Sequence, residues 1–570
     1  MTFKNSMSLL LIALIWVVPQ STAQNPAPPP TPQNATVSPG AQPAPGGMDA
    51  PMEMILDRAT AKENELIATL KNYTPMVETY IQNLMPNAEL GAVPKSDKYF
   101  LGKLDLKDGI NEHSLLPEPG FASALKNIVT QVYSIQYLPL GFIQMILIDG
   151  LKFDRANYDF EYVRREFLGE IKTYAFDVKP KPEYKGFTGR IWVEDQGYNI
   201  VRFNGTYNGS SAQKMFFHFD SWREQIGNGK WLPTYVYSEE SDMPYFLGSR
   251  KLRFKGQTRL WGYDVGKANL QNEFTSLSVE ADKVEDNGDA GEHNSPVLSQ
   301  RAWLRQAEDN VLARMQKAGV LAPEGEVDKV LQTVVNNLEI TNNLTMDPPI
   351  RCRVLLTQPL ESFSVGHTIV LSRGLVDVLP DEASLAMVLA HELGHIYLYH
   401  QIDTKYSFND RMIFPDVDTF RRLHMKRDEK EEKAADDRAM ELLQKSPYRD
   451  KLGNAGLFLV QLNERSRQMP NLLNAHMGNR LAQGKDVRRM PSLMGSAPPL
   501  ENAKLDQIAA LPLGGRLKLD PWHNRLDLIK TKPVALMSPR EKMPFEVTPV
   551  YLYLTRQKDA AAAANSKNNN

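Results

Sequence analysis

Two histidines four residues apart constrain this chain more than any other feature, because they lie within a long apolar stretch. The segment His391-Glu392-Leu393-Gly394-His395 follows Val388-Leu389-Ala390 and precedes Ile396-Tyr397. Four residues make about one helical turn, so both imidazoles would project from the same face of a helix and could bind one metal ion. A helix this apolar is expected to be buried, and buried polar groups need partners. The fold must therefore enclose this helix and supply further ligands.

The sequence marks where this helix begins and which helix faces it. Asp381 is the predicted N-cap, and Leu385, Leu389 and Ile396 form the predicted buried stripe. A second helix is predicted for residues 428–445. Its inner stripe comprises Glu432, Asp436, Ala439 and Leu443, whereas Lys430, Lys433, Asp437, Arg438 and Glu441 point elsewhere.

This pattern predicts a zinc site with one ion per chain. His391 and His395 are the first two predicted ligands and Glu432 is the third, with Glu431 and Glu429 as alternatives. Asp436, one turn after Glu432, is predicted to accept the remaining N–H of a ligating histidine. Glu392 is placed to take a proton from water and pass it to a leaving amine. The site is therefore predicted to be catalytic.

The residues after the second histidine distinguish between classes of zinc peptidase. A metzincin requires glycine at position 398 and histidine at position 401, but the chain has Leu398 and Gln401, and His400 is one residue out of register. Gluzincins instead take a glutamate from a downstream helix, and residues 428–445 form such a predicted helix. This reasoning favours Glu432.

Length and composition limit the rest of the molecule. A chain of 570 residues is too long for one core, and a net charge of −2 gives no electrostatic support for nucleic-acid binding. Residues 1–23 have the pattern of a secretory signal, so export to a periplasm or the medium is expected. No later segment is predicted to span a membrane. Residues 24–51 contain nine prolines, counted from the sequence, and are predicted to be a linker.

Residues 52–284 are predicted to form a helix followed by a mostly antiparallel β domain. Short alternating runs such as 198–203 and 214–219 are typical of strands, and Asn204-Gly205 is a typical turn signal. The strings Gly189-Arg190-Ile191-Trp192-Val193-Glu194 and Ile200-Val201-Arg202 are similar to strands of the periplasmic lipoprotein-carrier (LolA/RseB-like) half-barrels. That resemblance implies capture of an apolar chain or partner, and a packed structural sheet is the alternative.

The remaining residues divide into four predicted segments. Residues 285–298 are a polar linker, 299–510 a mainly helical metallopeptidase domain with a small edge sheet, 511–557 a C-terminal extension and 558–570 a disordered tail. The single cysteine, Cys352, rules out an intrachain disulfide. It is interpreted as an apolar strand residue rather than as a zinc-capping propeptide cysteine. The expected fold class is thus multidomain α+β.

The region from Val311 to Ala510 resembles peptidase family M48, the CAAX prenyl endopeptidase and HtpX-like gluzincins. The strings that carry the resemblance are Leu389-Ala390-His391-Glu392-Leu393-Gly394-His395, with Asp381-Glu382-Ala383 before it, and Glu432-Lys433-Ala434-Ala435-Asp436. The segment 363–375, with Ile369-Val370-Leu371 as its strand, resembles that family's substrate-binding edge strand. The resemblance implies metal-dependent endopeptidase activity on protein or peptide substrates that pair along this edge.

Two departures from the family pattern affect the expected mechanism. Asp428-Glu429 stands where the family usually has Ser-Arg, and Ala497 to Lys504 lacks the family's oxyanion-side histidine and arginine. Oxyanion stabilisation is therefore unassigned, with His476, Arg480, His523 and His367 as weaker candidates. The altered region around Ala497 and Ala503 also motivates a second hypothesis, a periplasmic client-binding protein with a structural or weakly active zinc site. The intact Glu392 argues against it, because a structural site needs no general base.

Overall fold

The computed structural model describes residues 50–87, 91–107, 111–116, 139–149, 152–207, 218–227, 229–245, 248–264, 296–400, 425, 427–473, 477–481, 490–499, 517–521, 523–528 and 552–556. The predicted signal (1–23), nearly all of the predicted linker (24–51) and the predicted tail (558–570) lie outside these residues. None of the described helices is both long and apolar enough to cross a membrane.

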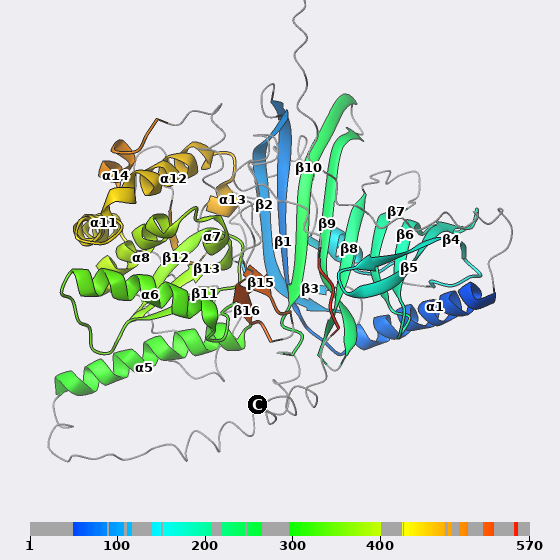
Figure 1. Cartoon of the computed structure of the whole chain (residues 1–570), viewed down its shortest axis with the longest axis horizontal. Helices are drawn as coiled ribbons and strands as arrows, with labels where there is room; N and C mark the ends of the chain where they lie inside the picture. The colour runs from blue at the N-terminus through cyan, green and yellow to red at the C-terminus, as the bar shows by residue number, and fades with distance from the viewer. Residues whose placement is uncertain are drawn as a thin grey trace, which may run out of the picture. The chain divides into compact units, whose positions relative to one another are not determined.

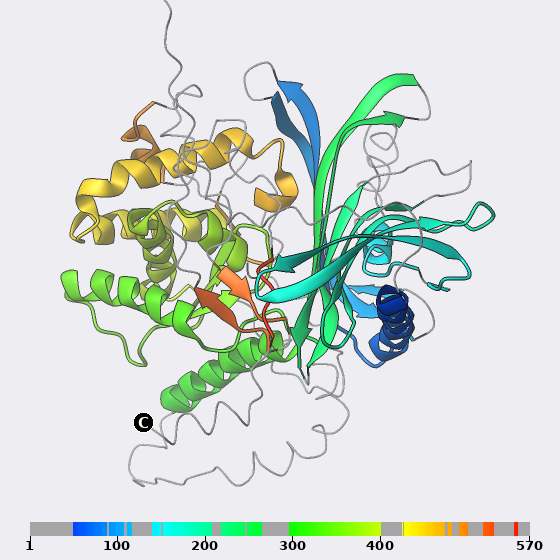
Figure 2. The ribbon, with the colours of Figure 1, turned by 45° about the vertical axis from the view of Figure 1, so that its right-hand side comes forward.

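A ten-stranded antiparallel sheet forms the N-terminal part, as predicted, and it is strongly curved (Figures 1 and 2). In spatial order the strands are β3 (Asn111–Ser114), β2 (Gly91–Asp105), β1 (Met76–Asn87), β10 (Gly248–Trp261), β9 (Lys230–Tyr245), β8 (Phe219–Ile226), β7 (Ile200–Tyr207), β6 (Phe187–Glu194), β5 (Ile171–Pro180) and β4 (Tyr158–Leu168). Strands β4 to β10 pair in sequence order, and β10 then pairs with β1. Neighbouring strands are thus mostly joined by short connections.

The predicted turn at Asn204-Gly205 is wrong, because both residues lie inside β7. Gly205 pairs with Gly189 of β6. A Cβ on Gly205 would lie 2.2 Å from the carbonyl oxygen of Thr188 and 2.7 Å from the Cα atom of Gly189. The glycine therefore allows the backbones of β6 and β7 to approach closely. An Asn-Gly pair in the sequence does not distinguish this role from a chain-reversing turn.

One face of the sheet carries the helices α1 (Ala50–Leu70) and α3 (Pro139–Gln144), whose apolar side chains share a buried core with the strands. At the centre of this layer Glu63 of α1 forms a fully buried ion pair with Arg223 of β8, with nitrogen to oxygen distances of 2.5 and 2.7 Å. The described part of this face thus contributes to one buried apolar core.

The C-terminal part is mainly helical and encloses a four-stranded sheet (Figure 1). Its helices are α5 (Pro296–Lys317), α6 (Glu326–Thr341), α7 (Arg373–Val378), α8 (Glu382–Tyr397), α11 (Glu429–Gln444), α12 (Leu452–Arg465), α13 (Pro470–Leu473) and α14 (Pro491–Gly495), with a 3-10 turn, η2, at Arg449–Lys451. Because α5 begins at Pro296, the last three residues of the predicted linker 285–298 are helical. The remainder of that linker, up to residue 295, lies outside the described residues.

The small sheet has the order β11 (Arg351–Leu355), β13 (Thr368–Ser372), β12 (Glu361–Val365) and β14 (Asn479–Arg480). The segment Ile369-Val370-Leu371, predicted to be an edge strand, is therefore in the interior, between β11 and β12. The prediction of an edge position failed for a physical reason. The apolar pattern of a strand indicates that it is buried, whereas its place in the sheet depends on which other segments pair with it. Strand β14 pairs with β12 only at Glu361 and Ser362.

Strand β1 of the large sheet contacts the C-terminal part through Glu78, which is almost completely buried. Its carboxylate accepts hydrogen bonds from Arg373 Nη2 (3.0 Å), from the backbone N–H of Gln358 (2.6 Å) and from Tyr99 Oη (2.8 Å). Three donors compensate the cost of burying the charge. The start of α7 is thereby held against β1.

Strand β2 supports the start of β12 through Asp97. Asp97 accepts the backbone N–H groups of Asn471 (3.0 Å) and Leu472 (2.7 Å) in α13, and burial raises the pKa of its carboxyl. The carbonyl of Leu472 in turn accepts the N–H of Leu360, the residue before β12, at 2.8 Å. The large sheet therefore forms part of the framework that holds β12.

The described part of the C-terminal extension contacts both regions. Strands β15 (Leu517–Leu519) and β16 (Leu526–Leu528) form a hairpin, and the N–H of Leu517 donates to Asp377 of α7 at 3.2 Å. The carbonyl of Pro521 accepts the N–H of Gly262, just after β10, at 2.8 Å. Leu554 is buried against the outer face of the large sheet.

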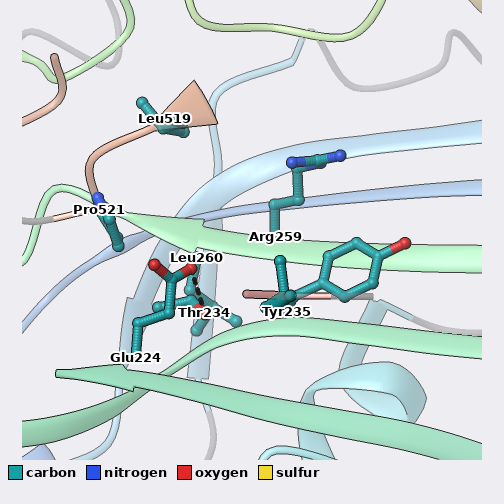
Figure 3. A pocket seen from close by; sticks show the side chains of 8 residues that line it. Glu224, Thr234, Tyr235, Arg259, Leu260, Leu519 and Pro521 are labelled. Carbon is teal, nitrogen blue, oxygen red and sulfur yellow. Dashed lines mark hydrogen bonds between the residues drawn. The ribbon is translucent and has the colours of Figure 1, made fainter. Parts of the chain in front are cut away.

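A small pocket lies between this extension and strands β8, β9 and β10 (Figure 3). It is lined by Glu224, Thr234, Tyr235, Arg259, Leu260, Leu519, Pro521 and Leu552. Thr234 Oγ1 donates to the Glu224 carboxylate at 3.2 Å, and burial raises the pKa of that carboxyl. None of the predicted metal ligands lines this pocket.

Candidate metal centre

Helix α8 carries both histidines of the predicted site into the core of the C-terminal part. Asp381 caps it as predicted, its carboxylate accepting the N–H of Ser384 at 2.8 Å. His391, Glu392 and His395 are all buried, with at most 1% of their surface exposed. Imidazoles and a carboxylate this deeply buried need specific partners, and the neighbouring helix supplies several of them.

Helix α11 brings Glu432 to the two histidines. Asp428 caps this helix by accepting the N–H groups of Lys430 and Glu431, both at 2.9 Å. The predicted inner stripe is buried, including Glu432 and Asp436, whereas Glu429, one of the alternative ligands, is exposed. Glu431 is only partly buried and is not part of the ligand cluster.

His391, His395 and Glu432 form a group with metal-ligand geometry, their donor atoms lying within 4.8 Å of one another. The two Nε2 atoms are 3.0 Å apart. The Glu432 oxygens lie 3.6 Å from His391 Nε2 and 3.4 Å from His395 Nε2. Tetrahedral ligands with bonds of about 2.0–2.1 Å should lie about 3.3 Å apart. The donor set and its spacing therefore fit a zinc ion with three protein ligands.

Asp436 lies behind the His391 ring, on the side away from the cluster. The Nδ1 atom of the ring lies 2.8 Å from Asp436 Oδ1, and the other oxygen of Asp436 accepts the N–H of Met490 at 3.0 Å. A carboxylate in this position fixes the histidine tautomer with its N–H on Nδ1, which leaves Nε2 as the free donor toward the cluster.

Glu392 is held from β12 by a residue that the sequence did not single out. Ser362 Oγ donates to Glu392 Oε1 at 2.7 Å, and both residues are fully buried. The other oxygen, Oε2, is buried and makes no hydrogen bond to any described residue. One carboxylate oxygen is thus fixed and the other is available to a ligand. A serine on a buried strand carries no local signal of this role, because only the packing of β12 against α8 creates it.

His400 is out of register for a metzincin ligand, but its side chain contacts His395. Its Nδ1 lies 2.8 Å from Nδ1 of His395, and the ring centroids are 5.0 Å apart. Burial lowers the pKa of His400, and burial likewise lowers the pKa of His395. Both shifts favour neutral imidazoles. The sequence shows a histidine five residues after His395, but its spacing excludes only a role as a metzincin ligand and does not predict this contact.

Arg427 is the second residue that the sequence reasoning missed. Its Nη2 donates to the carbonyl of Ser364 in β12 at 3.2 Å. Burial lowers its pKa, and the nearby carboxylates of Glu392, Glu431 and Glu432 oppose that shift. A partly buried cation therefore lies beside the metal-ligand cluster, although the family's Ser-Arg pair is absent from positions 428 and 429.

Four residues were weaker candidates for stabilising an oxyanion, and no described contact joins any of them to the metal-ligand cluster. His476 lies outside the described residues, and Arg480 is described only as a strand residue of β14. His523 is an exposed side chain bonded to Asp520 at 2.9 Å. His367 lies in the turn between β12 and β13.

Cys352 lies in β11 and is buried, in agreement with its interpretation as an apolar strand residue. Burial raises the pKa of its thiol far above the ordinary value. Cys352 is also not part of the cluster of donor atoms among the described residues, which is inconsistent with a zinc-capping role.

Part of the metal-ligand cluster lies in a stretch of the chain that matches the model of a known peptidase family. Residues 324–413 match the model of peptidase family M48, which confirms the resemblance found in the sequence. The match covers α6 to the end of α8 and includes His391, Glu392 and His395. The match ends before α11, so the assignment of Glu432 to the cluster is supported only by the distances given above. No curated protein has a detectable sequence match to this chain.

Two solved structures align with parts of the chain. One is a LolA superfamily protein from Nitrosomonas europaea, with 13% identity over 36% of this chain and 90% of that protein and a TM-score of 0.20. The other is a DUF1329 family protein from Desulfovibrio piger, with 12% identity over 40% of this chain and 98% of that protein and a TM-score of 0.17. TM-scores this low do not define a shared fold.

Proposed function

We propose, from the match of residues 324–413 to peptidase family M48, that this chain is a zinc-dependent metalloendopeptidase that hydrolyses peptide bonds in proteins. The observation that carries the proposal is the convergence of His391, His395 and Glu432 from two helices, with Glu392 beside them. A structural zinc site would close its fourth position with another side chain. Among the residues that the structure describes, the group contains three ligands, and a carboxylate suited to proton transfer adjoins them.

His391 and His395 would hold the metal through their Nε2 atoms and Glu432 through its carboxylate. When bound, zinc supplies a Lewis acid that makes water nucleophilic near neutral pH and polarises a carbonyl. Glu392 would take the proton of the attacking water on Oε2 while Ser362 keeps Oε1 in place. Glu392 would then deliver that proton to the leaving amine. Asp436 would keep His391 in the tautomer that ligates.

Arg427 is our candidate for the stabilising group that the sequence left unassigned. The carboxylates of Glu392 and Glu432 favour its positive charge, and we propose that this charge stabilises the negative charge that develops during attack on a carbonyl. Its hydrogen bond to the Ser364 carbonyl fixes the guanidinium against β12.

We further propose that the protein acts outside the cytoplasm, in a periplasm or in the medium, with a role in the quality control of envelope proteins. The support for export is the signal pattern of residues 1–23. The contacts of β1 with α7 and of β2 with α13 argue that the large sheet acts with the catalytic part rather than as a separate carrier.

The test combines metal analysis with cleavage of a peptide library by the mature protein. We expect one zinc per chain, cleavage that Glu392→Gln abolishes without loss of zinc, and loss of zinc in Glu432→Ala. Glu429→Ala is the matched control, because Glu429 is exposed on the same helix. Stoichiometric zinc with no Glu392-dependent cleavage would overturn the enzymatic function, and zinc retained in Glu432→Ala would overturn the third ligand.

A further inference from the structure

The end of helix α8 brings His400 back onto His395. Tyr399 adopts the left-handed conformation with φ of 57°, and its N–H donates to the carbonyl of Ile396 at 3.0 Å. The N–H of His400 donates to the carbonyl of His395, also at 3.0 Å. This pair of bonds defines a Schellman motif, in which the residue after the left-handed one contacts the third residue from the helix end. That contact is commonly apolar, but here both partners are imidazoles.

The two nitrogens of His395 face different neighbours. Its Nε2 lies 3.0 Å from His391 Nε2 and 3.4 Å from Glu432, on the side of the ligand cluster. Its Nδ1 lies 2.8 Å from His400 Nδ1, on the opposite side of the ring. Two imidazole nitrogens at this distance share one proton, so one of them donates and the other accepts.

We propose that His400 is a positioning residue that accepts the Nδ1–H of His395 and so presents His395 Nε2 to the metal. This role rests on the proposed zinc centre. A neutral imidazole that binds a metal through Nε2 carries its proton on Nδ1, and an acceptor at Nδ1 fixes both the tautomer and the ring orientation. His400 then does for His395 what Asp436 does for His391.

The geometry argues against His400 as a fourth ligand. Its Nδ1 lies behind the His395 ring, and the ligand cluster of the described residues comprises only His391, His395 and Glu432. Removing a partner of this kind typically weakens metal binding roughly 10- to 100-fold. The effect should therefore appear in zinc affinity, independently of any turnover.

The test compares two substitutions at His400 in the mature protein. His400→Asn places Oδ1 on Cγ, where Nδ1 stands, and keeps an acceptor, whereas His400→Leu keeps bulk and removes it. Zinc affinity is measured by competition with a chromophoric chelator, and thermal melts of the metal-stripped proteins report folding. We expect the leucine variant to bind zinc 10- to 100-fold more weakly and the asparagine variant to stay within a few-fold of wild type.

Wild-type affinity in His400→Leu would overturn the positioning role while leaving the zinc centre intact. Equal weakening in both variants, with unchanged metal-free melts, would also overturn it, because an acceptor would then make no difference. A wild-type protein that binds no zinc would instead overturn the proposed metal centre. If His400→Leu does not fold, His400→Ala replaces it in the same comparison.

Discussion

Gly394 of α8 lies directly against the backbone of Ala435 of α11. A Cβ at Gly394 would be 2.7 Å from the carbonyl oxygen of Ala435 and 3.1 Å from its Cα atom. Real Cβ atoms do not come this close to backbone, so only glycine allows the two helices to approach at this point. The glycine between Glu392 and His395 therefore sets the distance between the histidines on one helix and Glu432 on the other.

Gly394→Ala should destabilise the protein by about 1–3 kcal/mol through overpacking and should weaken zinc binding. Urea unfolding and chelator competition measure the two effects. Gly453→Ala in α12 is the control, because its Cβ would meet only Pro498 at 3.9 Å. Since alanine is the better helix former, the control should gain up to about 1 kcal/mol. Equal stability of the two variants would contradict the close approach of α8 and α11.

Ser362→Ala should lower kcat while leaving KM and zinc content unchanged, because Ser362 holds the proposed general base and no ligand. A hydrogen bond to a charged group contributes about 1.5–3 kcal/mol, which corresponds to a loss of roughly 10- to 100-fold. Ser364→Ala on the same strand is the control, since its buried hydroxyl bonds to no described residue. A similar kcat for both variants would rule out the positioning of Glu392 by Ser362.

Arg223→Met should cost about 3–5 kcal/mol of stability, because it leaves Glu63 buried without its partner. The double variant Glu63→Leu with Arg223→Met should recover much of that loss, since no charge then remains buried. Chemical unfolding measures both. Lys62→Met removes the exposed pair with Glu65 on the same helix and should have little effect. A double variant as unstable as Arg223→Met would show that the ion pair itself stabilises the fold.

Asp328 should make stability fall as the pH rises from about 4 to 6. Burial raises the pKa of its carboxyl from 3.8 to about 6. Within this window the folded chain keeps a proton that the unfolded chain has lost, so stability decreases with rising pH and is level above the window. Asp328→Asn retains an acceptor for the N–H of Gly325, now 2.6 Å from the carboxylate, but cannot ionise.

The Asp328→Asn variant should therefore gain stability relative to wild type between pH 4 and 6.5. Urea unfolding at several pH values provides the measurement. Parallel stability profiles for the two proteins would show that the carboxyl titrates alike in the folded and unfolded chains.

Tyr399→Gly should stabilise the protein by up to about 1 kcal/mol without changing zinc affinity. The left-handed backbone at Tyr399 strains any residue with a Cβ, and glycine relieves that strain. The tyrosine side chain is 76% exposed, so little packing is lost. Leu398→Gly, at an ordinary φ of −89°, should be destabilising. A loss of stability in Tyr399→Gly would mean that the tyrosine ring makes an unrecognised contribution.

Local periodicity was enough to find the core of the candidate site. Helical spacing placed His391 and His395 on one face, identified Asp381 and Asp428 as helix starts or boundaries, and selected Glu432 from three neighbouring glutamates. These features depend on residues within one or two turns of each other, and a helix imposes that geometry on any sequence that adopts it. The antiparallel character of the N-terminal sheet followed from the same kind of local pattern.

Only the tertiary structure decided what surrounds that core. Ser362 bonds to Glu392, and Gly205 pairs with Gly189. The segment from Ile369 to Leu371 lies in the interior of its sheet. Each of these features depends on segments that no local sequence pattern relates. His400 is the intermediate case, because its position was visible but its contact depends on the left-handed turn at Tyr399. The sequence by itself determined which side chains form the proposed metal centre, since their spacing is local. The packing of strands and helices decided which residues hold those side chains in place, because pairing between distant segments depends on the whole fold.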